Sequence, residues 1–181
     1  MVNTREIRAD YDDRSVVVYQ AYSPHIAEPA LDAQRFVAPF KLERMTWIKP
    51  SFLWMMYRCG WGLKEGQERV LAIRILRSGF DWAVANAVSS RVVGGNPDVR
   101  VQWDPERDLH LRPQQHRAIQ IGLRGDAVRR YVHDWTVSIT DVTGLAHEIH
   151  GLVRAGDLEA AAKHLPAERP YGTNTAPSAY F

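Results

Sequence analysis

The segment from Val70 to Leu76 constrains the fold more than any other part of the chain. Its sequence, VLAIRIL, is an almost continuous apolar run that a single arginine interrupts. A short run of this kind is typical of a strand in the interior of a sheet. The segment Ser15–Tyr22 (SVVVYQAY) is rich in β-branched and aromatic residues and predicts a second strand. Any fold for this chain must therefore place Val70–Leu76 inside a sheet.

Helices are predicted between the strands, without regular βαβ repeats. Pro50 suits a helix start, and Ser51–Cys59 (SFLWMMYRC) is apolar on nearly all sides, which indicates a buried helix. Other helices are predicted from Pro24 to about Arg35 and over Ser78–Ser89, Gly125–Asp134 and Thr143–Leu165, the last with a break at Gly156. Further strands are predicted over Arg44–Lys49, Val99–Trp103, Arg117–Leu123 and Thr136–Val142, and a polar loop over Trp103–Asp108. This mixture predicts an α+β fold with a mixed or mainly antiparallel sheet and packed helices.

The chain has 181 residues, which predicts a single globular domain over residues 1–165. Residues 166–181 contain three prolines and predict an extended or loosely ordered tail. An apolar share of 45% excludes wholesale disorder, and no run approaches the roughly 20 apolar residues of a membrane span. The charged N-terminal segment lacks the apolar stretch of a secretory signal, and the single cysteine excludes an internal disulfide. We therefore expect a cytoplasmic protein without a membrane partner.

The net charge of +2 conceals a local bias. The segment Arg35–Arg77 contains nine Lys or Arg and three Glu, a local charge of +6, which leaves −4 for the rest of the chain. Seven of the 18 aromatic residues also lie in this segment. A basic, aromatic-rich segment suits phosphate binding combined with base stacking. The alternative interpretation is a core-forming region with a solvated basic rim.

Several common catalytic motifs are absent from the sequence. It contains no GxGxxG, no GxxxxGK[ST], no HExxH and no GxSxG, so dinucleotide-binding Rossmann folds, P-loops, zincins and α/β-hydrolases lose their main support. His147 and His150 are three residues apart instead of the four that HExxH needs, so we predict no metal site. Cys59 follows Arg58, but its predicted helix is buried, which favours a core residue over a nucleophile.

Two short segments carry candidate ligand-binding side chains. The strand ending in Tyr19, Gln20, Ala21 and Tyr22 leads directly into a helix start, where anionic ligands are often held. Gln20 offers a donor and an acceptor that match an amide, and a tyrosine can stack on a ring. The alternative is an ordinary strand with alternating faces.

The second segment, RMTWIKPS, places Arg44, Thr46, Lys49 and Ser51 within eight residues. Two cations, a hydroxyl and a helix N-terminus form a candidate phosphate site. The alternative is a strand edge with solvated cations. In the predicted loop, Glu106 is a candidate to orient a ribose hydroxyl or to act as a general base. Its alternative is a turn whose charges pair locally.

Long strings of the sequence resemble a known family. They are IRADYDDRSVVVYQAYSPHIA, RMTWIKPSFLWMMYRCGWGLKEGQERVLAI, VQWDPERDLHL and RAIQIGL. Together they resemble the domain-of-unknown-function family numbered 4291, from about Ile7 to Val142. This resemblance implies no activity.

The layout of VVVYQAYSPHIAEPAL is more distantly similar to the opening of ADP-ribosyltransferase folds. In that superfamily such a turn binds nicotinamide, an aromatic region follows, and a late carboxylate orients the ribose. The resemblance implies Tyr19, Gln20 and Tyr22 for the first role, Thr46 and Ser51 for the second, and Glu106 for the third. Gln20 stands where histidine or arginine is usual.

The leading hypothesis is an ADP-ribosyltransferase-like enzyme with NAD or a related nucleotide as cofactor. Gln20 and Tyr22 would hold the nicotinamide, Arg44 and Lys49 the phosphates, and Glu106 the ribose or the incoming nucleophile. The alternative is a non-enzymatic nucleic-acid-binding module with Arg44, Trp47 and Lys49 on its surface. A third possibility is a scaffold protein whose aromatic residues all lie in the core. Convergence of Gln20, Arg44, Lys49 and Glu106 on one concave pocket would support the enzyme.

Overall fold

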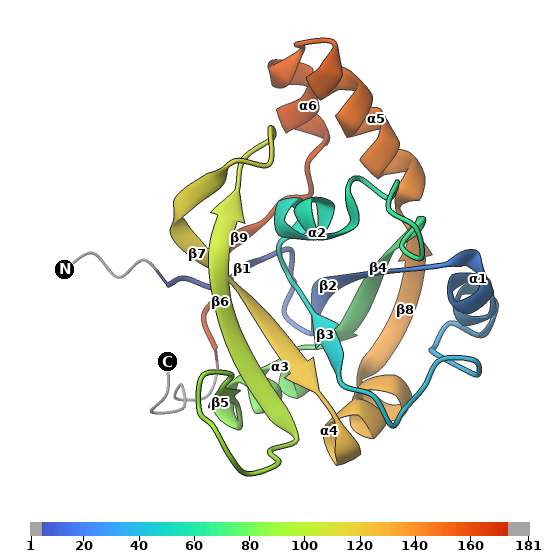
Figure 1. Ribbon diagram of the computed structural model, residues 1–181, viewed down its shortest axis with the longest axis vertical. Helices are drawn as coiled ribbons and strands as arrows, with labels where there is room; N and C mark the ends of the chain where they lie inside the picture. Colours follow the sequence, from blue (N-terminus) through green and yellow to red (C-terminus); the bar gives the residue numbers. More distant parts are fainter. Residues whose placement is uncertain (1–4, 174–181) are drawn as a thin grey trace.

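The computed structural model describes residues 5–173 and contains two main antiparallel sheets (Figure 1). One sheet has the strand order β2-β4-β8, with β2 at Ser15–Tyr22, β4 at Arg69–Leu76 and β8 at Thr136–Asp141. The other has the order β3-β7-β6-β5, with β3 at Thr46–Ile48, β7 at Pro113–Leu123, β6 at Val99–Arg107 and β5 at Val88–Ser89. Within the described residues, β5 and β6 form the one parallel strand pair of these sheets. The fold is α+β in a single domain, as predicted.

The two sheets enclose the main core. Strand β4 lies between β2 and β8, as predicted for Val70–Leu76, and Ile73 and Ile75 are fully buried in this core. Ile121 and Leu123 of β7 meet them from the other sheet. Burial of branched apolar side chains between two sheets supplies the hydrophobic stabilisation of such a fold.

Strand β2 is buried on both faces. Val16 and Val18 belong to the core between the sheets, whereas Val17 and Tyr19 belong to a second cluster. Successive side chains of a strand point to opposite faces, so this strand separates the two clusters. The second cluster includes residues of α2 (Phe52–Cys59) and α5 (Thr143–Arg154).

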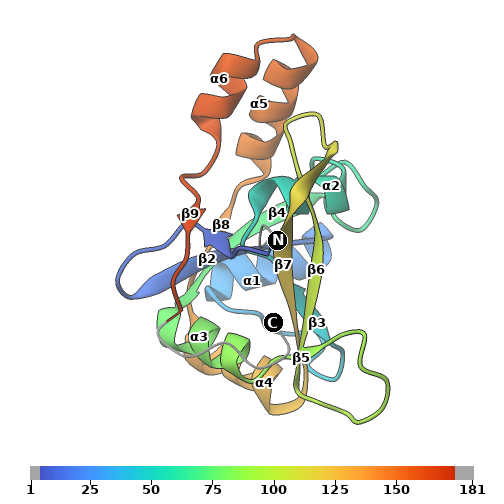
Figure 2. The same cartoon turned by 90° about the vertical axis from the view of Figure 1, so that its left-hand side faces the viewer.

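Helix ends follow the capping residues of the sequence. Ser51 caps α2 by accepting a hydrogen bond from the Trp54 backbone N–H, and Gly60 ends it in the left-handed region at φ 57°. The predicted break at Gly156 is confirmed, because α5 ends at Arg154 and α6 covers Leu158–His164. These two helices project beyond the ends of both sheets (Figures 1 and 2). The remaining helices are α1 (Pro24–Ala33), α3 (Arg77–Ala85), α4 (Gly125–Arg130) and the π-helix η1 (Tyr131–Trp135).

Two sequence predictions of local structure are wrong. The predicted loop Trp103–Asp108 is mostly strand, because β6 continues to Arg107 alongside β7. Pro105 is tolerated there because the register shifts between Pro105 and Arg107, and prolines occur in strands at such irregularities. The helix predicted over Ser78–Ser89 ends at Ala85, because Val88 and Ser89 pair with β6.

The described part of the C-terminal segment packs on the domain. Strand β9 (Arg169–Pro170) pairs with β1 (Arg8–Ala9), and Tyr171 is buried against Phe80. The end of the predicted tail, residues 174–181, lies outside the described residues. Within residues 5–173, no helix is both long and apolar enough to cross a bilayer.

Candidate functional site

The two main sheets meet where β2 and β3 touch. The backbone N–H of Tyr19 donates to the carbonyl of Lys49 at 2.8 Å, which is the isolated bridge between the two strands. This contact brings the strand end Tyr19–Tyr22 beside the segment Arg44–Ser51, although 24 residues or more separate the paired side chains in sequence. The two segments that the sequence singled out are therefore neighbours.

Gln20 lies at the centre of a buried hydrogen-bond network. Its Nε2 donates to the Tyr22 hydroxyl at 2.9 Å and to Oγ1 of Thr46 at 2.7 Å. Its Oε1 accepts from the hydroxyl of Tyr131 at 2.6 Å. Both amide hydrogens are thus used internally, so Gln20 fixes the side chains around it. The sequence did not point to Tyr131, which lies 111 positions away from Gln20.

The network leaves one hydroxyl hydrogen for a ligand. Tyr22 and Thr46 both accept from Gln20, and their oxygens are 3.1 Å apart, so one hydroxyl donates to the other. Each hydroxyl carries one hydrogen, so once one hydroxyl donates to the other, the remaining hydrogen has no acceptor among Gln20, Tyr22 and Thr46. Burial raises the pKa of Tyr22 to about 12, which keeps its hydroxyl protonated. The pair can therefore donate one hydrogen bond into the adjoining cavity.

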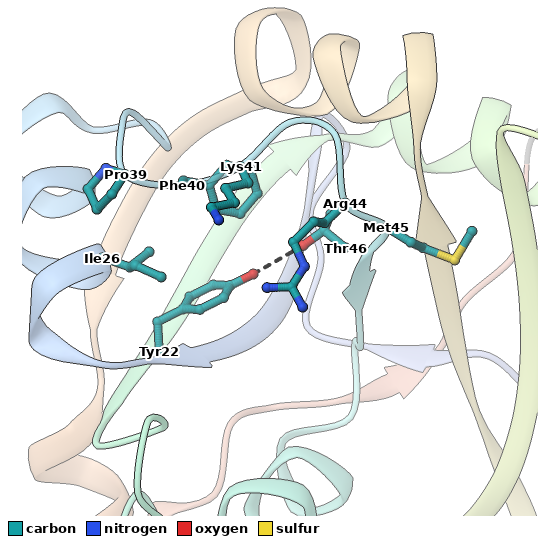
Figure 3. Close-up of a pocket in the computed structure, with 8 residues that line it drawn as sticks. All are labelled: Tyr22, Ile26, Pro39, Phe40, Lys41, Arg44, Met45 and Thr46. Carbon is teal, nitrogen blue, oxygen red and sulfur yellow. Dashed lines mark hydrogen bonds between the residues drawn. The ribbon is translucent and has the colours of Figure 1, made fainter.

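Two cavities adjoin this network. The first, which we call the Tyr22 cavity, has a volume of about 250 Å³. Figure 3 shows its walls, with Tyr22 on β2, Arg44 beside its hydroxyl, and the loop that carries Phe40 and Lys41 opposite. The second, which we call the Lys49 cavity, measures about 350 Å³ and is lined by Gln20, Ala21, Tyr22, Arg44, Met45, Thr46, Trp47, Lys49, Met55, Arg58 and Gln67. Both cavities share the residues Tyr22, Arg44, Met45 and Thr46.

The walls of both cavities are cationic. Lys41 and Arg44 line the Tyr22 cavity, and Arg44 and Arg58 line the Lys49 cavity. No aspartate or glutamate is among the described residues that line either one. Guanidinium groups in a wall without lining carboxylates favour an anionic ligand, and arginine suits phosphate because it donates in a planar fork.

Lys49 is a buried lysine at the wall of its cavity. The residue is only 7% exposed, and its Nζ donates to the carbonyl of Trp47 at 2.9 Å. Nζ also lies 5.6 Å from the centre of the Trp54 ring. Desolvation, followed by repulsion from Arg58, lowers the pKa of Lys49 from 10.5 to about 7. The amine is therefore largely neutral above that pH.

Ser51 and Glu106 meet at the N-terminus of α2, apart from the lining of the two cavities. The Ser51 hydroxyl donates to Oε1 of Glu106 at 2.7 Å, and the backbone N–H of Arg107 donates to the same oxygen at 2.9 Å. Glu168 lies beside them, with Oε1 accepting from the backbone N–H of Phe52 at 2.7 Å. Desolvation, together with the nearby charge of Glu106, raises the pKa of Glu168 to about 8, although the hydrogen bond from Phe52 acts against this rise.

The structure thus groups the residues predicted from the sequence into three places. Gln20, Tyr22, Arg44, Thr46 and Lys49 line the Lys49 cavity. Ser51 and Glu106 lie together at the start of α2 and line neither cavity. Tyr19 points to the other face of β2, where its ring packs edge-on against Phe52 at 5.5 Å.

Sequence reasoning missed several residues at these places. Lys41 and Arg58 line the cavities, and Glu168 lies with Glu106 at the start of α2. The local charge of Arg35–Arg77 was a signal for the two cations. No sequence signal marked Glu168, because its contact with Phe52 spans 116 positions.

His150 and Cys59 both pack against other side chains of the fold. His150 stacks on Trp61 with 5.2 Å between ring centres, and desolvation lowers its pKa. Cys59 is fully buried, and desolvation raises the pKa of its thiol. Among residues 5–173, no three His, Cys, Asp or Glu side chains gather closely enough to hold a metal ion.

Comparison with known proteins identifies one protein family. The profile of the family described as Domain of unknown function (DUF4291) matches residues 6–171. No curated protein and no solved structure matches the chain significantly.

Proposed function

The chain belongs to the DUF4291 family, and since that description assigns no activity, we propose a function from the site itself. We propose that the protein binds NAD or a related nucleotide in the Tyr22 and Lys49 cavities and transfers its ADP-ribosyl group to an acceptor. The observation that carries this proposal is the cationic lining of two adjoining cavities without any lining carboxylate among the described residues.

The two cavities suit the two kinds of group that a nucleotide contains. Arg44 belongs to both walls, so a phosphate near its guanidinium would lie at the junction of the cavities. Phe40 and Tyr22 offer ring surfaces in the Tyr22 cavity, where a planar base or a nicotinamide ring can pack. The hydroxyl pair of Tyr22 and Thr46 supplies a hydrogen-bond donor for a carbonyl oxygen. Arg58 adds a further permanent charge for a phosphate.

Glu106 is our candidate for the carboxylate of the reaction. Cleavage of the bond between ribose and nicotinamide develops positive charge on the ribose, which a fixed carboxylate stabilises. Hydrogen bonds from Ser51 and from the backbone of Arg107 hold one oxygen of Glu106 in place. In this proposal the ribose extends from the Lys49 cavity toward α2, where Ser51 follows Lys49 by two residues.

Binding is tested by thermal unfolding with NAD, ADP-ribose, ADP and a short RNA. A nucleotide at about 100 times its dissociation constant should stabilise the protein by roughly 2.7 kcal/mol. Arg44→Gln should weaken nucleotide binding about tenfold or more, whereas Arg154→Gln, an exposed arginine on α5, should not change it. Absence of any stabilisation by NAD and by ADP-ribose would refute the proposal.

Turnover is tested by the release of nicotinamide from NAD. Glu106→Gln should keep NAD binding and slow the release about 100-fold or more, as for loss of a group that stabilises a transition state. A variant that releases nicotinamide at the wild-type rate would remove Glu106 from the reaction while leaving the binding proposal intact.

The nucleic-acid-binding alternative remains as an outcome of the same experiment. It requires Arg44, Trp47 and Lys49 on an accessible surface, and the burial of Lys49 weakens its support. Stabilisation by RNA alone, with an affinity that falls steeply as salt rises, would favour this alternative.

A further inference from the structure

We propose that Lys49 is a reactive amine that forms an imine with an aldehyde or ketone carrying a phosphate group. This activity uses the Lys49 cavity but requires neither NAD nor Glu106, so it goes beyond the function proposed above. The argument rests on the position of the amine, its hydrogen bonds, its surroundings and the cations of the same wall.

Lys49 lines a cavity and is shielded from bulk solvent. It lines a space of about 350 Å³, although the residue is only 7% exposed. Cavities of this size accommodate small metabolites. A carbonyl compound in this cavity would therefore lie beside a lysine that is largely shielded from bulk water.

The amine is held in place by a single hydrogen bond. Nζ donates to the carbonyl of Trp47, and within residues 5–173 no carboxylate lies within ion-pair distance of it. Asp104 is the nearby carboxylate, but its two oxygens accept from Gln102 at 2.9 Å and from Gln120 at 2.6 Å. An ammonium group would need three acceptors, so this environment suits the neutral amine with its lone pair.

The charged groups around Lys49 act on its amine in opposite directions. Arg58 on α2 repels a positive charge on the amine, whereas Asp104 on β6 and the buried Cys59 attract it. Desolvation is the largest effect, acts in the same direction as Arg58, and lowers the pKa of Lys49 to about 7 despite Asp104 and Cys59. A neutral amine is the nucleophilic form, and buried lysines of this kind serve as imine-forming residues.

The same wall supplies the selectivity for a phosphate. Arg44 and Arg58 line the cavity with Lys49 and keep their charges at any physiological pH. A phosphate bound to these guanidinium groups would hold a carbonyl of the same molecule near Nζ. The predicted substrate class is therefore a small phosphorylated aldehyde or ketone, which includes sugar phosphates in their open-chain forms.

The chemistry of the step is balanced without another reactant. The lone pair of Nζ attacks the carbonyl carbon, a C–N bond forms, and one proton passes from the nitrogen to the carbonyl oxygen to give a carbinolamine. The second hydrogen of the nitrogen and the hydroxyl group then leave together as water, and the nitrogen lone pair forms the C=N bond. Addition of water to the imine reverses the step.

The chain offers a clean way to test this reaction, because it contains four lysines: Lys41, Lys49, Lys64 and Lys163. Lys49 is buried and the other three are exposed. The protein is incubated with pyridoxal 5′-phosphate, reduced with borohydride and mapped by peptide mass spectrometry. Pyridoxal without the phosphate serves as the matched probe.

We expect pyridoxal 5′-phosphate to label Lys49 at least tenfold faster than each exposed lysine and at least tenfold faster than pyridoxal does. Labelling of Lys49 should increase through about pH 7, and inorganic phosphate should slow it. Arg44→Gln should reduce the advantage of the phosphorylated probe, whereas Lys64→Arg should leave the labelling of Lys49 unchanged. Lys49→Arg should abolish imine formation.

Three results would overturn the proposal. They are equal labelling of all four lysines, no labelling of Lys49, and labelling of Lys49 that does not depend on the phosphate of the probe. The wild-type protein and Arg44→Gln decide the question even if Lys49→Arg does not fold. A failure of the NAD experiments leaves this test unaffected, because the probe contains no nucleotide.

Discussion

Ser51 donates a hydrogen bond of 2.7 Å to Glu106, a residue 55 positions later in the chain. The same hydroxyl accepts a hydrogen bond from the backbone N–H of Trp54 and thereby caps α2. One serine therefore both starts a helix and holds the carboxylate of Glu106 on β6. The capping of α2 and the orientation of Glu106 are coupled through this oxygen.

Loss of the Ser51 hydroxyl should destabilise the protein. Ser51→Ala removes the cap of α2, which typically costs about 1 kcal/mol, and it also removes the donor to Glu106. We expect the free energy of unfolding, measured in urea, to fall by about 1–2 kcal/mol. The control Ser90→Ala changes a serine outside the helices and should stay within about 0.5 kcal/mol of the wild type. Equal stability of both variants would contradict the coupling.

The buried network around Gln20 should depend on the hydroxyl of Tyr131. Tyr131→Phe leaves Oε1 of Gln20 without its 2.6 Å donor in a buried site, which costs about 1–3 kcal/mol. Tyr57→Phe is the matched control, because the Tyr57 side chain is exposed at 47%. Chemical denaturation of the two variants checks the prediction, and a Tyr131→Phe protein as stable as the wild type would show that the hydrogen bond contributes nothing.

Local patterns in the sequence predicted much of the fold. The strand Ser15–Tyr22 is confirmed with the same bounds, and α2 (Phe52–Cys59) lies within the predicted helix Ser51–Cys59. The break at Gly156 is also confirmed, since that residue has φ 81°. These features depend on side chains that are close in sequence, and capping and turn preferences act at that range.

Long-range pairing was the part that the sequence did not reveal. Pro105 and Glu106 resemble a polar loop, yet β7 provides a partner strand that extends to Pro113. Five candidate residues converge on the Lys49 cavity because β2 and β3 join through Tyr19 and Lys49, a contact that no local sequence pattern indicates. Glu168 was not predicted for the same reason, because its contact at the start of α2 is also long-range.

Even an alanine at Gly79 in α3 should destabilise the protein. A Cβ atom on Gly79 would lie 2.4 Å from Cγ of Trp135, which is far closer than van der Waals contact. Because Trp135 is buried, Gly79→Ala must displace it and should cost about 1–3 kcal/mol.

The control for this prediction is a glycine in an open position. A Cβ atom on Gly151 in α5 meets nothing within 4 Å, so Gly151→Ala should stabilise the protein by about 0.5–1 kcal/mol through helix propensity. The two variants should therefore shift the thermal midpoint in opposite directions. Shifts of the same sign would contradict the packing of Trp135 on Gly79.

The stability of the protein should depend on pH through Glu168. Burial raises the pKa of this carboxyl from 4.5 to about 8, so the native state holds its proton over a range where the unfolded chain has lost it. The native state then binds more protons than the unfolded state, and the free energy of unfolding falls as pH rises from about 4.5 to about 8. Below that range both states are protonated, and the contribution is fully present.

Glu168→Gln should remove this dependence. The amide resembles the protonated carboxyl and keeps an oxygen that accepts from the backbone N–H of Phe52. At pH 4.5 the variant and the wild type should therefore have similar stability, whereas at pH 8.5 the variant should be more stable by at least about 1 kcal/mol. Glu65→Gln, at an exposed position, should show the same difference from the wild type at both pH values. Urea unfolding across this range measures the effect. Parallel pH profiles for wild type and Glu168→Gln would mean that burial does not raise the pKa of Glu168 in the native state.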